Sequence, residues 1–74
     1  MSRAENRILC EMCRAQYPPI GEIIRYAKEH PLAAKTKDWF GLSPLHYLAM
    51  NKHVDHNDLR EIFEKAPVIK AEFA

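Results

Sequence analysis

Apolar residues recur at helical spacing in four stretches of this 74-residue chain, at about residues 3–15, 20–29, 43–51 and 55–66. Residues three and four positions apart lie on one face of a helix, so each stretch predicts an amphipathic helix with its apolar face toward a core. The predicted core residues are Ile8, Leu9, Met12 and Cys13; Ile20, Ile23, Ile24 and Ala27; Leu45, Leu48 and Ala49; and Leu59, Ile62 and Phe63. We therefore expect an all-α fold of about four helices. The chain has only two glycines and no sustained alternation of apolar and polar residues, which argues against an all-β fold.

Prolines are predicted to separate these helices, because the residue before a proline is driven out of the helical region. Tyr17-Pro18-Pro19 should end the first helix, His30-Pro31 the second and Ala66-Pro67 the fourth. Residues 32–37 are then expected to form a connector. Asp55 or Asn57 is expected to cap the fourth helix.

Residues 38–49, Asp-Trp-Phe-Gly-Leu-Ser-Pro-Leu-His-Tyr-Leu-Ala, predict a tight turn followed by the start of a helix. Gly41 permits a positive φ, so the chain can reverse there. Ser43 is a good N-cap, and Pro44 then falls at the first helical position, where its missing N–H is harmless. His46 lies within one turn of Ser43, close enough for its ring to bond the capping hydroxyl.

This stretch resembles the turn and first helix of an ankyrin repeat, whose signature runs Asp-x-x-Gly-x-Thr-Pro-Leu-His-x-Ala. Ser43 stands in place of the signature threonine, and Leu48 in place of its first alanine. The larger Leu48 should hold neighbouring helices slightly further apart. The resemblance implies that the turn is ordered by Asp38, Gly41, Ser43, Pro44 and His46.

A shift of 36 residues aligns the first half of the chain with the second, pairing Leu9 with Leu45, Ile23 with Leu59, and Pro31 with Pro67. Apolar positions and a proline repeated at one offset are typical of a repeat array. We expect a single domain over residues 1–74, with a degenerate first repeat at about 3–36, a second repeat at about 37–67 and a tail at 68–74. The resemblance implies an ankyrin-like helical solenoid of two helix pairs with projecting turns. Either the tail packs back over the last helix pair, or the chain is a fragment of a longer array.

The composition excludes several classes of function. A net charge of +1 gives no field for binding nucleic acid. With no long apolar run and no signal-peptide pattern at the N-terminus, we expect no membrane insertion and a cytoplasmic or nuclear location. The sequence contains no Gly-rich phosphate loop and no nucleophile–base set, so we expect no enzymatic activity.

Cys10 and Cys13, together with His53 and His56, are the residues that could hold a zinc ion tetrahedrally. Cys13, however, aligns with Ala49 in the repeat, where a small apolar residue is wanted, and free cysteine is often buried for that reason. We favour the structural interpretation and expect neither a metal nor a cofactor.

The resemblance implies a protein–protein interaction module or adaptor that binds another protein through its turn tips and first helices. The positions that contact partners in the family correspond here to Lys37, Trp39, Phe40, Leu42, Tyr47, Met50 and Asn51. Large aromatic residues at a turn tip suit an interface, although Trp39 or Phe40 could instead fold back onto the neighbouring turn. The alternative function is that of a small accessory subunit packed permanently in a larger assembly. Because about three repeats are needed to cover the apolar faces of such an array, we expect the isolated chain either to self-associate or to be only marginally stable.

Overall fold

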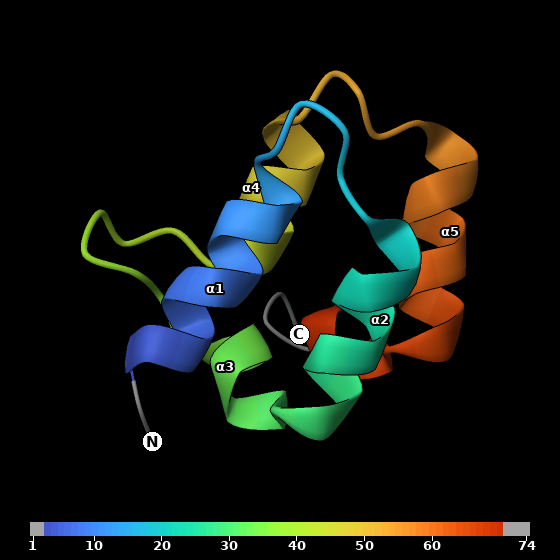
Figure 1. Ribbon diagram of the computed structural model, residues 1–74. Coiled ribbons are helices and arrows are strands. Elements are labelled where there is room, and N and C mark those ends of the chain that lie inside the picture. Colours follow the sequence, from blue (N-terminus) through green and yellow to red (C-terminus); the bar gives the residue numbers. More distant parts are fainter. Residues whose placement is uncertain (1–2, 71–74) are drawn as a thin grey trace.

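The computed structural model describes residues 3–70, and within that range every regular element is an α-helix (Figure 1). The helices are α1 (Arg3–Cys13), α2 (Ile20–Glu29), α3 (Pro31–Lys35), α4 (Pro44–Met50), α5 (His56–Lys65) and α6 (Pro67–Lys70). The expectation of an all-α fold is confirmed.

One apolar core is shared by all the described helices. Its buried side chains are Leu9, Cys10, Cys13, Ile23, Ile24, Ala27, Ala33, Ala34, Leu45, Tyr47, Leu48, Ile62, Ala66 and Ile69 on or beside the helices, and Val54 in the α4–α5 loop. The predicted inner face of α2 is confirmed, since Ile23, Ile24 and Ala27 are all buried. The fourth predicted helix also has its cap at Asp55, whose side chain accepts from the backbone N–H of Asp58 at 2.8 Å.

Two residues predicted to face the core do not. Ile8 is 45% exposed, because the buried face of α1 runs through Asn6, Leu9, Cys10 and Cys13 and is rotated away from it. Ala49 is also exposed, as is the next residue, Met50.

The prediction that residues 32–37 form only a connector after the second helix is wrong. Residues 31–35 form α3, and residues 67–70 form α6 at the corresponding place after α5. Pro31 and Pro67 each stand at the first position of a new helix, where the fixed φ of proline favours helix and its missing N–H would have no partner in any case. Each proline therefore ends one helix by starting the next.

The break before each proline has the same backbone conformation. His30 has φ −129° and ψ 69°, and Ala66 has φ −133° and ψ 68°. In both cases the backbone N–H still donates to the residue four positions earlier, at 2.8 Å for His30 and 2.7 Å for Ala66. The chain thus turns sharply without leaving this N–H unbonded.

The helices of the second half pack on those of the first. Helix α1 packs against α4, α2 against α5, and α3 against α6 (Figure 1). The bounds of α2, residues 20–29, recur in α5 at residues 56–65, and the starts of α3 and α6 recur at the same offset. Of the tail, Ile69 is buried within α6, and residues 71–74 lie outside the described range.

Two asparagine side chains join elements that are distant in sequence. The amide of Asn6 donates to the carbonyls of Ala33 at 3.0 Å and Thr36 at 2.7 Å, which fixes α1 to the end of α3. The amide of Asn51 donates to the carbonyls of Cys13 and Ala15, both at 2.9 Å. These carbonyls lie at or beyond helix C-termini, where intrahelical partners are missing.

We expect Asn51→Ala to lower the free energy of unfolding by about 1–3 kcal/mol, because it leaves two carbonyls at the end of α1 without this donor. Urea denaturation followed by circular dichroism measures this loss. Asn57→Ala, at an exposed position near the start of α5, is the matched control and should change stability by less than about 0.5 kcal/mol. Equal losses in the two variants would contradict this role for Asn51.

Candidate functional site

The turn that precedes α4 is built around the side chain of Asp38. One carboxylate oxygen, Oδ1, accepts from the backbone N–H of Phe40 at 2.9 Å and of Leu42 at 3.0 Å. The backbone closes the same turn, with Asp38 N–H donating to Leu42 O at 2.8 Å and Gly41 N–H donating to Asp38 O at 3.0 Å. Gly41 has φ 79°, a conformation that disfavours residues with a Cβ.

The other oxygen of Asp38 accepts a hydrogen bond from the hydroxyl of Tyr47 on α4. The ankyrin resemblance implies that Tyr47 contacts a partner, whereas in the structure Tyr47 is only 9% exposed and its hydroxyl holds the turn against α4. Arg14, directly after α1, lies over the Tyr47 ring, with its guanidinium carbon 5.9 Å from the centroid. The structural role of Tyr47 could not be inferred from the repeat signature, where this position is variable.

These bonds shift the acidity of both groups. Desolvation tends to raise the pKa of Asp38, but the Tyr47 hydroxyl and the backbone N–H groups of Leu42 and Phe40 outweigh it, so the pKa lies below its usual 3.8. The bond to Asp38, together with desolvation, raises the pKa of Tyr47 to about 12. At neutral pH the pair is therefore a carboxylate and a neutral phenol.

Ser43 and His46 form the expected bond at the start of α4. The His46 Nδ1 atom lies 2.8 Å from Ser43 Oγ and 3.0 Å from the backbone nitrogen of Ser43. Because Nδ1 accepts from the Ser43 backbone N–H, it carries no proton, and the Ser43 hydroxyl must also donate to it. Ser43 is fully buried, so these bonds satisfy a polar side chain inside the protein.

The two aromatic residues at the tip of the turn are largely exposed. The side chain of Trp39 is 81% exposed and that of Phe40 is 76% exposed. Of the two sequence-based alternatives, folding back onto the neighbouring turn is therefore wrong.

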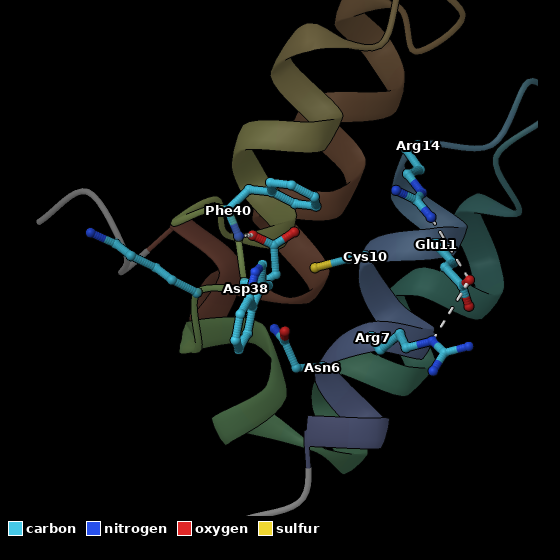
Figure 2. A pocket seen from close by; sticks show the side chains of 9 residues that line it. Asn6, Arg7, Cys10, Glu11, Arg14, Asp38 and Phe40 are labelled. Atoms are coloured by element: carbon cyan, nitrogen blue, oxygen red, sulfur yellow. Dashed lines mark hydrogen bonds and ion pairs between the residues drawn. The ribbon is translucent and has the colours of Figure 1, made fainter.

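A hollow of about 540 Å³ lies between this turn and the exposed side of α1 (Figure 2). It is lined on one side by Asn6, Arg7, Cys10 and Glu11 of α1 and by Arg14 directly after that helix, and on the other side by Lys37, Asp38, Trp39 and Phe40. Figure 2 shows Phe40 and Asp38 facing Cys10 of α1 across the hollow, with Arg7, Glu11 and Arg14 further along the same part of the chain as Cys10. The structure thus joins Lys37, Trp39 and Phe40 to a surface of α1.

The α1 wall of this hollow was missed from the sequence. The signal lay in the polar residues Arg7, Glu11 and Arg14, which are spaced for one helix face beside the predicted apolar stripe. The remaining predicted contact residues do not line the hollow. Met50 is 63% exposed at the end of α4, whereas Leu42 and Asn51 are half-buried.

The charge of the hollow is predominantly positive. Glu11 is shared between Arg7 at 4.0 Å and Arg14 at 3.8 Å, and the charge of Asp38 is directed into the turn. Lys37 adds an exposed cation beside Trp39. The hollow therefore suits a ligand that carries an apolar group next to a negative charge.

The candidate zinc ligands are not brought together. Among residues 3–70, no group of three or more His, Cys, Asp or Glu side chains is placed to hold a metal ion. Desolvation raises the pKa of the Cys10 thiol to about 11 and raises that of Cys13 as well. Both residues are buried and free, in keeping with a role in core packing.

Comparison of the chain with protein-family models, with curated proteins and with solved structures gave no match. Within the described part of the chain, none of the helices combines the length and the apolar character needed to cross a membrane.

We expect Ser43→Ala to lower the free energy of unfolding by about 1 kcal/mol, the usual effect of losing an N-cap. His46→Ala should have a comparable effect. The double variant should lose less than the sum, because both substitutions remove the same bond. Urea denaturation of the four proteins measures the coupling, and strict additivity would show that the bond contributes no stability.

A second expectation concerns pH. The lowered pKa of Asp38 means that its contribution to stability is fully present above the unfolded-state value of 3.8 and is lost as the pH falls through the lower folded-state value. Asp38→Asn should therefore be about 1–2 kcal/mol less stable at neutral pH, and this difference should shrink on acidification.

Unfolding free energies measured across this pH range test the expectation. Glu29→Gln, an exposed carboxylate at the end of α2, is the control and should track the wild type. A difference between Asp38→Asn and wild type that stays constant down to the acid limit would contradict the assignment.

Proposed function

We propose that this chain is a protein-interaction module of the ankyrin-repeat type that binds a segment of another protein in the hollow between the 38–42 turn and α1. The observation that carries the proposal is the exposure of Trp39 and Phe40 on a turn that is itself firmly bonded. Exposed aromatic side chains on a rigid support lose little conformational entropy on binding, and such residues dominate interface energetics.

The well-ordered turn supports this proposal over the alternative that Trp39 and Phe40 are exposed only because they lie in a loose loop. The backbone between Asp38 and Leu42 is fixed by the hydrogen bonds to the Asp38 carboxylate and by Gly41. The aromatic side chains are thus held out from the surface before any partner arrives. Preorganisation of this kind favours binding because the ordering cost has already been met during folding.

The charges of the hollow point to the chemistry of the partner segment. Arg7, Arg14 and Lys37 outnumber Glu11, and Asp38 is engaged by the turn. An apolar side chain would pack against Trp39 and Phe40, while a neighbouring aspartate or glutamate would meet the arginines. We therefore propose a partner segment that combines apolar and acidic residues. Electrostatic complementarity should contribute mainly to specificity and association rate.

The experiment uses short synthetic peptides that carry a central Leu or Phe flanked by Asp and Glu, with a second panel in which Lys replaces the acidic residues. Trp39 is the single tryptophan of the chain, so its fluorescence reports directly on the hollow. We expect a blue shift with the acidic panel and none with the basic panel. The Trp39→Ala, Phe40→Ala double variant should bind at least about thirtyfold more weakly by calorimetry, since aromatic anchors typically contribute about 2 kcal/mol or more.

Tyr17→Ala is the matched control, because Tyr17 is 84% exposed and lies outside the hollow. It should leave peptide affinity unchanged. Circular dichroism should be the same for all variants, since each removes an exposed side chain. Binding that survives in the double variant, or equal binding of both peptide panels, would contradict the proposed function.

A further inference from the structure

Asn6 brings a buried polar side chain to the hollow between α1 and the turn. The residue is only 4% exposed, and it is one of those that line the hollow. Figure 2 shows the Asn6 amide group directed toward the part of the hollow that Cys10 and Asp38 line. A buried polar group at such a place raises the question of what it bonds.

The hydrogen bonds of Asn6 determine which end of its amide is available. The Nδ2 group donates to the carbonyl oxygens of Ala33 at 3.0 Å and Thr36 at 2.7 Å. Because a carbonyl oxygen only accepts, the nitrogen must be the atom that faces these two residues, and Oδ1 occupies the other branch of the amide. Both N–H donors of the side chain are therefore used within the chain, and Oδ1 is the atom left for another molecule.

The Oδ1 atom of Asn6 has no strong donor of its own. Within residues 3–70, no N–H or O–H group donates to it. In the same range, every side-chain nitrogen or oxygen that is fully closed off from solvent has a hydrogen-bond partner. Oδ1 is therefore not closed off, and it opens where Asn6 lines the hollow. The Cys10 thiol also interacts with the Asn6 side chain, but a thiol is only a weak donor.

The other polar groups of the hollow do not offer a free acceptor. Its arginines and lysine carry only donors. The Asp38 carboxylate already accepts three hydrogen bonds from within the chain. Glu11 is paired with two arginines. A ligand in the hollow thus meets cations for its negative charge, aromatic rings for its apolar group, and Asn6 Oδ1 for a hydrogen-bond donor.

We propose that Asn6 Oδ1 accepts a hydrogen bond from a backbone N–H of the bound segment, next to the apolar residue that packs against Trp39 and Phe40. The inference rests on the proposed peptide-binding function and identifies the group that recognises the peptide backbone. An apolar side chain that enters the hollow takes its own backbone N–H out of water, and a buried N–H without an acceptor is costly. Asn6 supplies that acceptor from α1, and the bond also satisfies Oδ1 once the ligand has displaced its water.

The test uses the acidic peptide with a central Leu, in a series in which each backbone amide in turn is replaced by an ester. An ester keeps the shape of the amide and lacks its N–H. We expect one ester, at or next to the central Leu, to weaken binding about tenfold, because Oδ1 is then covered without a donor. The other esters should change the affinity by less than about threefold. Titrations followed by Trp39 fluorescence measure these affinities.

Two variants separate recognition by Asn6 from its structural role. Asn6→Ala and Asn6→Asp both lose the donor to Ala33 and Thr36, so both lose stability, but only aspartate keeps an acceptor at this position. The ratio of amide-peptide affinity to ester-peptide affinity should fall to about one in Asn6→Ala and stay at about ten or more in Asn6→Asp. The ratio is measured within each variant, so a general loss of affinity does not affect it. The ester series in the wild type needs no variant and stands even where these chains do not fold.

A pair of small probes keeps this test separate from that of the proposed function. Benzamide carries an apolar ring with an N–H donor, and N,N-dimethylbenzamide carries the same ring without the donor. In NMR spectra of the isotope-labelled chain, millimolar benzamide should shift the side-chain amide signals of Asn6, and the dimethyl compound should not. If the acidic peptide binds, the ester series decides. If it does not bind, the proposed function is wrong and the benzamide pair decides.

The outcomes that would overturn the role of Asn6 are specific to it. With a peptide that binds, esters that all weaken binding to the same extent, or an ester effect that persists in Asn6→Ala, would overturn it and leave the proposed function intact. With no peptide bound, Asn6 signals that respond to neither probe, or equally to both, would overturn it.

Discussion

The carboxylate of Asp38 is the group on which the exposed surface of this protein depends. One of its oxygens accepts hydrogen bonds from the backbone N–H groups of Phe40 and Leu42, and the other accepts one from the Tyr47 hydroxyl. The first pair of bonds shapes the turn, and the third fixes the turn to α4. Because the backbone on both sides of Trp39 and Phe40 is held, these side chains stand clear of the core and enclose a hollow against α1. Loss of the carboxylate would therefore release the wall of the hollow as well as cost stability.

Local chemistry in the sequence accounts for much of the fold. The stripe of α2, the cap at Asp55, and the Ser43–His46 pair follow from residue types and spacing, and all are present. Pro31 and Pro67 were misinterpreted because a proline ends one helix and is equally suited to begin another. Tertiary packing decides whether a new helix follows the proline. Here Ala33 and Ala34 of α3 and Ile69 of α6 are buried in the core, which stabilises both short helices.

The candidate site could be predicted only in part, because it joins segments whose relation is not local. The repeat signature predicts the turn residues Lys37, Trp39 and Phe40. The residues of α1 on the other side of the hollow could be predicted only by knowing how α1 is rotated about its axis. That rotation depends on Asn6, a polar residue inside the apolar face that bonds the end of α3. A prediction from the spacing of apolar residues ignores a buried polar residue such as Asn6. The prediction for α1 therefore turned Ile8 toward the core and omitted Cys10 from it.

The buried thiol of Cys13 offers a way to follow the opening of the core. Cys10 and Cys13 are both buried, and burial raises the pKa of both thiols. Alkylating and oxidising reagents attack the thiolate of an accessible cysteine. Cys10 lines the hollow, whereas Cys13 is fully buried and does not, so modification of Cys13 must wait for a transient opening of the core. The rate at which Cys13 is labelled therefore reports how often the core opens, and a ligand that stabilises the folded chain should lower that rate.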